Sequence, residues 1–170
     1  MKTFNTIIAA AALVGVIAST PAAMADDEYN VSTGTTVSGA GVALRGVDAV
    51  ALATGLEVAP GRAVFTVEHD GVAYYFASEQ SMAQFSEDPD RYLPQFGGFC
   101  AYGVAIGLKL DANPHFADIV DGQLYLFLNE VAFERYLEDP AGTIALAEEN
   151  WPGMHHRAVE DVNGLETASR

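Results

Sequence analysis

Apolar and polar residues alternate along one stretch of the chain and then change to a helical spacing. Apolar side chains occupy alternate positions in residues 62–69, Asp70-Gly71 supplies a hairpin turn, and residues 72–76 form an aromatic-rich return strand. Ser78 is a typical helix N-cap, and Asp88-Pro89 is typical of a helix end. The pattern therefore predicts a strand, a second strand and a helix in succession.

The same pattern recurs further along the chain. Residues 121–140 align with residues 70–89 without a gap, and eight of the twenty positions are identical. A strand over residues 123–128 and a helix capped by Asn129 are expected there, followed by a third helix over Thr143–Asn150 that ends before a Trp-Pro pair. Two strand–strand–helix units packed about one core, joined by a Gly-rich loop, predict a small α+β domain.

The N-terminus has the order of features found in a secretory signal. Lys2 is followed by an apolar run over Ile7–Ala18 and by the small residues of Ala23-Met24-Ala25. The apolar run is shorter than the roughly 20 residues that span a bilayer. We therefore expect cleavage between Ala25 and Asp26 and a periplasmic or secreted protein.

The rest of the chain has the length of one ordinary domain. The Ser-, Thr- and Gly-rich residues 26–45 predict a flexible lead-in, residues 46–156 the folded domain, and residues 157–170 a tail. No second run of residues approaches membrane-spanning length.

The strongly negative net charge of the chain limits the partners it can bind. The chain has 8 basic and 23 acidic residues, for a formal net charge of −15 at pH 7. Because phosphate neutralisation needs Lys and Arg, this balance argues against nucleic acid and anionic membrane surfaces as partners. A metal ion or a metal-handling protein remains compatible with it.

A Gly-rich segment joins the two units and contains the single cysteine of the chain. Residues 94–107 place four glycines around Cys100. Glycine permits tight backbone folding, so the sulfur is expected to be held within a compact loop. Without a second cysteine, Cys100 is a buried inert thiol, a metal ligand, a redox-active thiol or half of an intermolecular bond.

Several separated blocks carry a family resemblance. The blocks are Gly46-Val47-Asp48-Ala49-Val50-Ala51, Tyr74-Tyr75-Phe76-Ala77-Ser78, Asp88-Pro89-Asp90-Arg91-Tyr92, Gly97-Gly98-Phe99-Cys100-Ala101-Tyr102-Gly103-Val104-Ala105, Asp121-Gly122-Gln123-Leu124-Tyr125-Leu126 and Asn150-Trp151-Pro152. In this order they resemble the YHS-domain family, specifically its exported bacterial branch.

The resemblance implies a small metal-associated module, and this sequence departs from its pattern at the family's ligand positions. Ala77 stands where a His or Cys often occurs. Residues 49–51 and 79–82 hold no cysteine, although cysteine-rich relatives have cysteines there. Cys100 alone matches a cysteine of the exported branch, so the ligand set of those relatives is not carried over.

A soft-metal site is the first functional hypothesis. Cys100 with Met154, His155 and His156 offers thiolate, thioether and imidazole ligands, a combination that suits Cu(I), with Zn(II) as the alternative. The Met-His-His run follows a Trp-Pro pair and is expected on a loop that reaches toward the thiol. The competing interpretation is that this run is an ordinary surface feature.

Two other functional classes remain open. In a metal-free ligand- or protein-interaction domain, Cys100 is a buried packing residue, and aromatic side chains either line a small pocket or, for the most part, form the core. The candidate aromatic residues are Tyr74, Tyr75, Phe99, Tyr102 and Tyr125. A redox role for Cys100 instead needs an accessible thiol of lowered pKa. No nucleophile elbow, phosphate-binding loop or His-Glu-x-x-His motif is present, so we favour a non-enzymatic role without excluding an enzyme.

Overall fold

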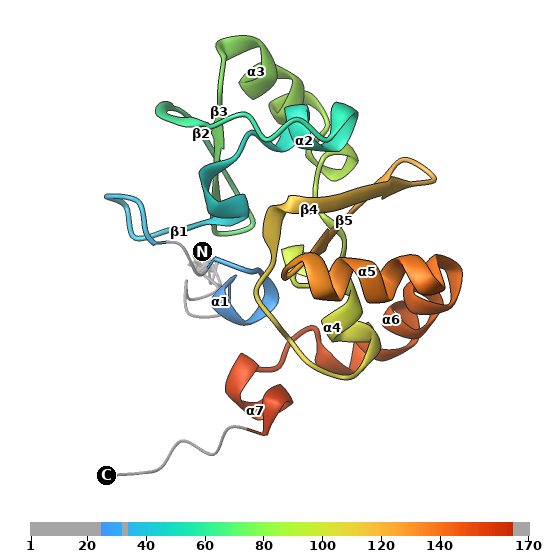
Figure 1. The fold of residues 1–170 in the computed structure, drawn as a ribbon. Coiled ribbons are helices and arrows are strands. Elements are labelled where there is room, and N and C mark those ends of the chain that lie inside the picture. The colour runs from blue at the N-terminus through green and yellow to red at the C-terminus, as the bar shows by residue number, and fades with distance from the viewer. Residues whose placement is uncertain (1–24, 32–33, 165–170) are drawn as a thin grey trace, which may run out of the picture.

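The structure, a computed structural model, describes residues 25–31 and 34–164 and contains one small α+β domain (Figure 1). Its fold class agrees with the prediction from sequence. The helices are α1 (Ala25–Glu28), α2 (Ala49–Gly55), α3 (Glu79–Glu87), α4 (Ala101–Ala105), α5 (Glu130–Glu138), α6 (Pro140–Met154) and α7 (Val159–Asn163). The strands are β1 (Gly41–Val42), β2 (Arg62–His69), β3 (Val72–Phe76), β4 (Asn113–Val120) and β5 (Gln123–Phe127). Three short 3₁₀ helices are η2 (Ala43–Gly46), η3 (Pro89–Arg91) and η4 (Gln95–Gly98).

The two predicted hairpins share their turn and their irregularities. Asp70 and Asp121 both have positive φ, of 50° and 53°, and each is followed by a glycine with positive φ that completes the turn. The antiparallel pairing of β2 with β3 is interrupted between Arg62 and Thr66, and that of β4 with β5 at the corresponding place after Asn113. In the first sheet β1 adds to β3 in parallel, giving the order β1-β3-β2.

The helix that follows each hairpin begins at the predicted cap. The Ser78 hydroxyl accepts a hydrogen bond from the Ser81 N–H, and the Asn129 side chain accepts one from the Ala132 N–H. α3 ends at Glu87, before the η3 proline, as predicted.

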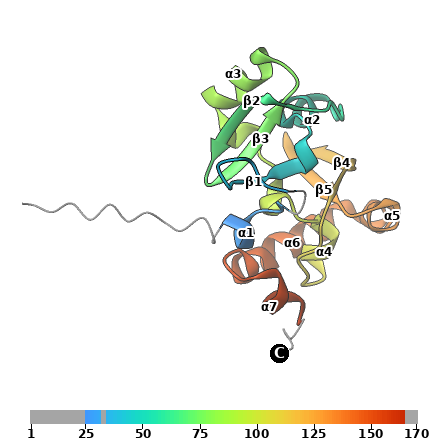
Figure 2. The ribbon, with the colours of Figure 1, turned by 90° about the vertical axis from the view of Figure 1, so that its left-hand side faces the viewer.

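Strand β5 lies between two hydrophobic cores. Its alternating side chains place Leu124 and Leu126 in the first core and Tyr125 and Phe127 in the second. The main large members of the first core are Leu52, Tyr74, Phe76, Phe85 and Tyr92. Those of the second core are Phe96, Phe99, Tyr125, Phe127 and Tyr136, and Cys100, Val104, Ala147 and Met154 also belong to it. Figures 1 and 2 show α2 and α3 over the first core, and α4 to α6 around the second.

Two helices differ from the expectation. The third helix, α6, extends beyond Thr143–Asn150 in both directions, because Asp139 caps its start through the Gly142 N–H and Pro140 suits the first helical turn. Pro152 lies in the exposed last turn, where α6 continues to Met154. Helix α2 was not predicted, although Asp48 caps it with hydrogen bonds to two N–H groups.

The predicted flexible lead-in is partly core. Val42, Ala43 and Leu44 are buried, so the packed domain begins before residue 46. Within the predicted tail, Val159–Asn163 form the short helix α7. The apolar run of the predicted signal lies outside the described residues, and none of the helices within 25–31 and 34–164 has the length and hydrophobicity to cross a membrane.

Candidate metal site

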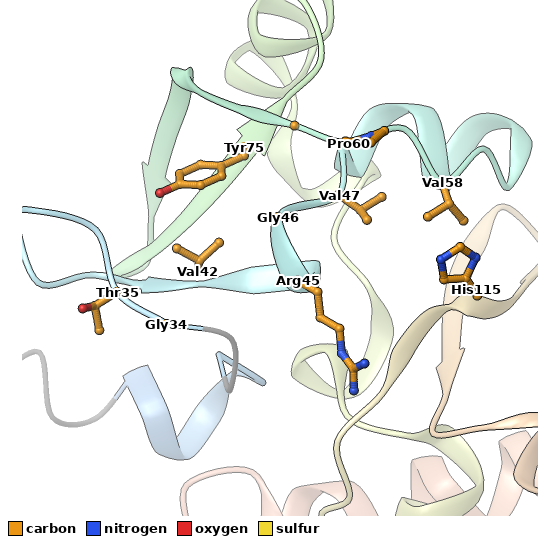
Figure 3. A pocket seen from close by; sticks show the side chains of 11 residues that line it. Gly34, Thr35, Val42, Arg45, Gly46, Val47, Val58, Pro60, Tyr75 and His115 are labelled. Carbon is orange, nitrogen blue, oxygen red and sulfur yellow. The ribbon is translucent and has the colours of Figure 1, made fainter.

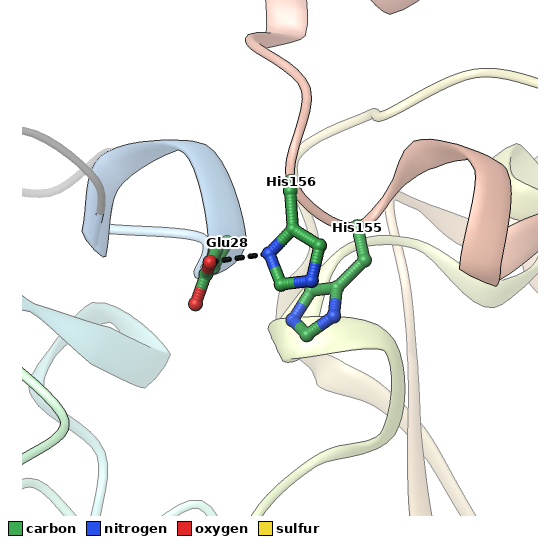
Figure 4. Close-up of side chains that lie close together, drawn as sticks. All are labelled: Glu28, His155 and His156. Carbon is green, nitrogen blue, oxygen red and sulfur yellow. Dashed lines mark hydrogen bonds and ion pairs between the residues drawn. The ribbon is translucent and has the colours of Figure 1, made fainter.

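Three side chains of types that can ligate a metal ion converge where the N-terminal helix meets the end of α6. Glu28 ends α1, and His155 and His156 directly follow α6 (Figure 4). One ligand atom from each residue lies within 4.8 Å of the others. The Glu28 Oε1 and His156 Nδ1 atoms are 2.5 Å apart, a hydrogen-bonding distance. We call Glu28, His155 and His156 the metal site.

The end of α6 separates the Met-His-His run into a buried and an outward-facing part. Met154 is buried in the second core, whereas His155 is half-buried and His156 is exposed. The His155 ring packs against the Trp151 ring at 4.9 Å and against the His156 ring at 4.2 Å between centroids. This packing fixes the direction of the first imidazole and leaves the second accessible.

Lys109 links the two segments that carry the metal site, namely α1 and the residues after α6. Its ammonium donates hydrogen bonds to the carbonyl of Asp27 in α1 and to those of His155 (3.0 Å) and Arg157 (2.7 Å). The same group lies over the rings of Phe99 and Trp151, at 5.2 and 5.4 Å from their centroids. Its three N–H donors are thus all used, and the side chain is only 1% exposed.

Burial and neighbouring charge keep His155 ready to act as a ligand. Desolvation lowers the pKa of His155, and the adjacent His156 lowers it further. Glu28 acts in the opposite direction and Lys109 in the same direction as burial. His155 is therefore neutral near pH 7, which is the form that binds metals.

Cys100 has the contacts of an enclosed packing residue. It is fully buried in the second core and precedes α4, where its Sγ accepts a hydrogen bond from the Gly103 N–H at 3.3 Å. Burial raises the pKa of the thiol, an effect that the backbone N–H groups oppose. This environment disfavours the thiolate that both metal binding and redox chemistry require.

The structure thus divides the four predicted ligands into two pairs. His155 and His156 join Glu28, while Cys100 and Met154 both belong to the second core. The full set of four as one metal site stays a prediction. Sequence reasoning missed Glu28, which lies in the region predicted to be a flexible lead-in. The one signal for it was the acidic run of Asp26, Asp27 and Glu28.

The other candidate residues lie elsewhere. The His69 ring meets Phe85 edge-on and lies 3.5 Å from the Asp70 carboxylate. His115 is exposed on β4 and lines a pocket, together with Tyr75. The other predicted pocket aromatics do not line it: Tyr74 is in the first core, Phe99 and Tyr125 are in the second core, and Tyr102 packs against the second core.

Comparison with known proteins gives one family match. Residues 53–96 match the YHS domain, which supports the resemblance to the YHS-domain family. That domain is a metal-associated module linked to copper. No curated protein and no solved structure matches the chain. The matched residues run from α2 to η4, so the metal site lies outside them.

Proposed function

We propose that this chain is an exported, non-enzymatic metal-binding module that holds a copper or zinc ion at the metal site. The observation that carries the proposal is the convergence of Glu28, His155 and His156 within 4.8 Å. The family match supports a metal-associated role in general, because the YHS domain is associated with metals, but the matched residues do not include the metal site.

The ligand types favour a divalent ion. Two imidazoles and a carboxylate suit Zn(II) and Cu(II), whereas Cu(I) prefers thiolate and thioether sulfur. The sulfur atoms of Cys100 and Met154 are buried in the second core, so the divalent state replaces the Cu(I) expected from sequence. Divalent affinities rise toward Cu(II), which therefore binds more tightly than Zn(II) here.

Three protein ligands suit a role in which the ion is passed on. A four-coordinate ion held by Glu28, His155 and His156 keeps one position for water or for a ligand from a partner. His156 is exposed, so a partner can approach the ion from that side. The ion displaces the hydrogen bond between Glu28 and His156 and lies near the Lys109 ammonium. The lost hydrogen bond and the nearby positive charge both weaken metal binding relative to an isolated His₂Glu site. Weaker binding is expected of a protein that passes its metal ion to a partner.

A metal titration with matched variants tests the site. Purified protein is titrated with Cu(II) and with Zn(II), alongside the double variant His155→Ala/His156→Ala, the single variant Glu28→Gln, and His69→Gln as a histidine control. We expect one ion per chain, loss of binding in the double variant, and weaker binding in Glu28→Gln, which removes one charged ligand.

A Cys100→Ser variant separates this site from the one predicted by sequence. The proposal requires Cys100→Ser to bind as the parent does. Retained binding in the double histidine variant, with loss in Cys100→Ser, would instead locate the ion at the second core.

Export has its own test. Expression of the full chain in a bacterium, followed by mass measurement of the periplasmic fraction, should give a protein that begins at Asp26. Such cleavage retains Asp27 and Glu28, which contact Lys109 and His156. Recovery of the uncleaved chain from the cytoplasm would contradict the export proposal and leave the metal site unaffected.

A further inference from the structure

A pocket of about 650 Å³ is lined by residues of the first unit and by His115 (Figure 3). It lies between the segment containing β1 and η2, the segment before β2, and the start of β4. Its apolar lining comes from Val42, Val47, Val58, Pro60 and the Tyr75 ring. Pockets of this size and lining are typical of small-molecule sites.

The charge of the lining is opposite to that of the protein. Arg45 and His115 line the pocket and no Asp or Glu does, although the chain has 23 acidic and 8 basic residues. Within residues 25–31 and 34–164, Arg45 is the one Arg or Lys side chain without a hydrogen bond, ion pair or ring contact. The His115 ring likewise has no such partner among the described residues. Both groups are thus available to an anion.

The backbone holds Arg45 in a conformation that few residues adopt. Leu44, Arg45 and Gly46 have successive φ values of 53°, 52° and 74°, and such strain in non-glycine residues persists only where the surroundings impose it. Leu44 is buried in the first core, and the Gly61 N–H donates to the Gly46 carbonyl at 2.8 Å. A Cβ on Gly61 would lie 2.7 Å from that oxygen, so glycine is needed for this contact. Arg45 is therefore presented by a rigid segment.

We propose that this pocket binds a small organic carboxylate with an apolar body. The carboxylate pairs with the Arg45 guanidinium, the apolar body lies against Val47 and Val58, and the His115 ring borders the same pocket. This site shares no residue with the metal site. The inference therefore stands or fails independently of the proposed metal function.

A nuclear magnetic resonance titration of the ¹⁵N-labelled protein tests the proposal, with a chelator present to exclude metal effects. Benzoate is the probe, benzamide is its neutral control of the same shape, and inorganic phosphate is an anion without an apolar body. We expect benzoate to bind more tightly than both and to shift the amide signals of Arg45, Gly46 and Gly61. Equal binding of benzoate and benzamide, no binding of either, or tighter binding of phosphate would overturn the proposal.

Variants identify the charged partner. Arg45→Gln should weaken benzoate binding about tenfold and leave benzamide binding unchanged, because it removes one charge-assisted pair. Arg135→Gln removes the same charge from α5, where Arg135 pairs with Glu138, and should bind benzoate as the parent does. His115→Gln should cause a smaller loss. Among the described residues the Arg45 side chain makes no hydrogen bond, ion pair or ring contact, so a well-dispersed spectrum of Arg45→Gln with unchanged benzoate affinity would refute the assignment.

Discussion

The substitution Lys109→Met is predicted to destabilise the protein and to loosen the metal site together. Methionine keeps an apolar stem between Phe99 and Trp151 but removes the ammonium group. The carbonyls of Asp27, His155 and Arg157 then each lose a charged donor. These carbonyls belong to α1 and to the turn after α6. Both segments that carry the metal site therefore lose the ammonium group that joins them.

The structure gives the size of the expected effect. Each carbonyl left without its partner costs about 1–3 kcal/mol if it stays buried. The two ring contacts contribute about 0.5–2 kcal/mol more. Relief from burying a charge acts in the opposite direction, as the lowered pKa of Lys109 indicates. Exposure of these carbonyls to water reduces the loss further, so we expect a net destabilisation of at least about 1 kcal/mol.

Urea unfolding followed by the fluorescence of Trp151, the single tryptophan, measures this effect. Arg135→Met is the control, because it removes an exposed charge whose ion pair is worth about 1 kcal/mol or less. We also expect Zn(II) to bind more weakly to Lys109→Met, despite the loss of a nearby positive charge. Unfolding within about 0.5 kcal/mol of the parent, or tighter Zn(II) binding, would refute the anchoring role.

Three further predictions concern single side chains. Asp48→Ala should lower the free energy of unfolding by about 3–5 kcal/mol in the same urea assay, because the buried carboxylate accepts four hydrogen bonds, and the exposed Asp111→Ala should change it little. Cys100 should react with a thiol reagent at the rate of global unfolding, and rapid reaction of the native protein would contradict its enclosure. Burial and Asp70 raise the pKa of Tyr29 to about 12, so its contribution to stability is complete below pH 10 and is lost as the pH rises through 12. Tyr29→Phe should remove that part of the alkaline loss of stability, and an unchanged alkaline profile would count against it.

Much of the fold follows from local sequence signals. The Asp-Gly turns, the caps at Ser78 and Asn129 and the alternating strands act over a few residues, so pattern reasoning identified both hairpins and their helices. α2 escaped this reasoning because a 7-residue helix with little polar contrast has a weak period. Its start depends on Asp48, whose carboxylate also accepts hydrogen bonds from the Ala77 N–H, just after β3, and from the Ser81 hydroxyl in α3.

The candidate site was only half predictable. His155 and His156 are conspicuous as adjacent histidines, but Glu28 reaches them across 128 residues of sequence. That contact depends on the docking of α1, which the Lys109 ammonium stabilises. Residue types in a Ser- and Gly-rich segment carry no signal for such docking. The sequence also did not show that α6 ends at Met154. That end point places Met154 in the core and leaves His155 and His156 on the side facing Glu28.

X-ray absorption spectroscopy of the Zn(II)-loaded protein tests the metal site most directly. The proposal predicts a first shell of nitrogen and oxygen at about 2.0–2.1 Å, with the outer-shell scattering of two imidazoles. His155→Ala/His156→Ala should remove that imidazole signature. A sulfur shell at about 2.3 Å would contradict the assignment and place Cys100 at the metal.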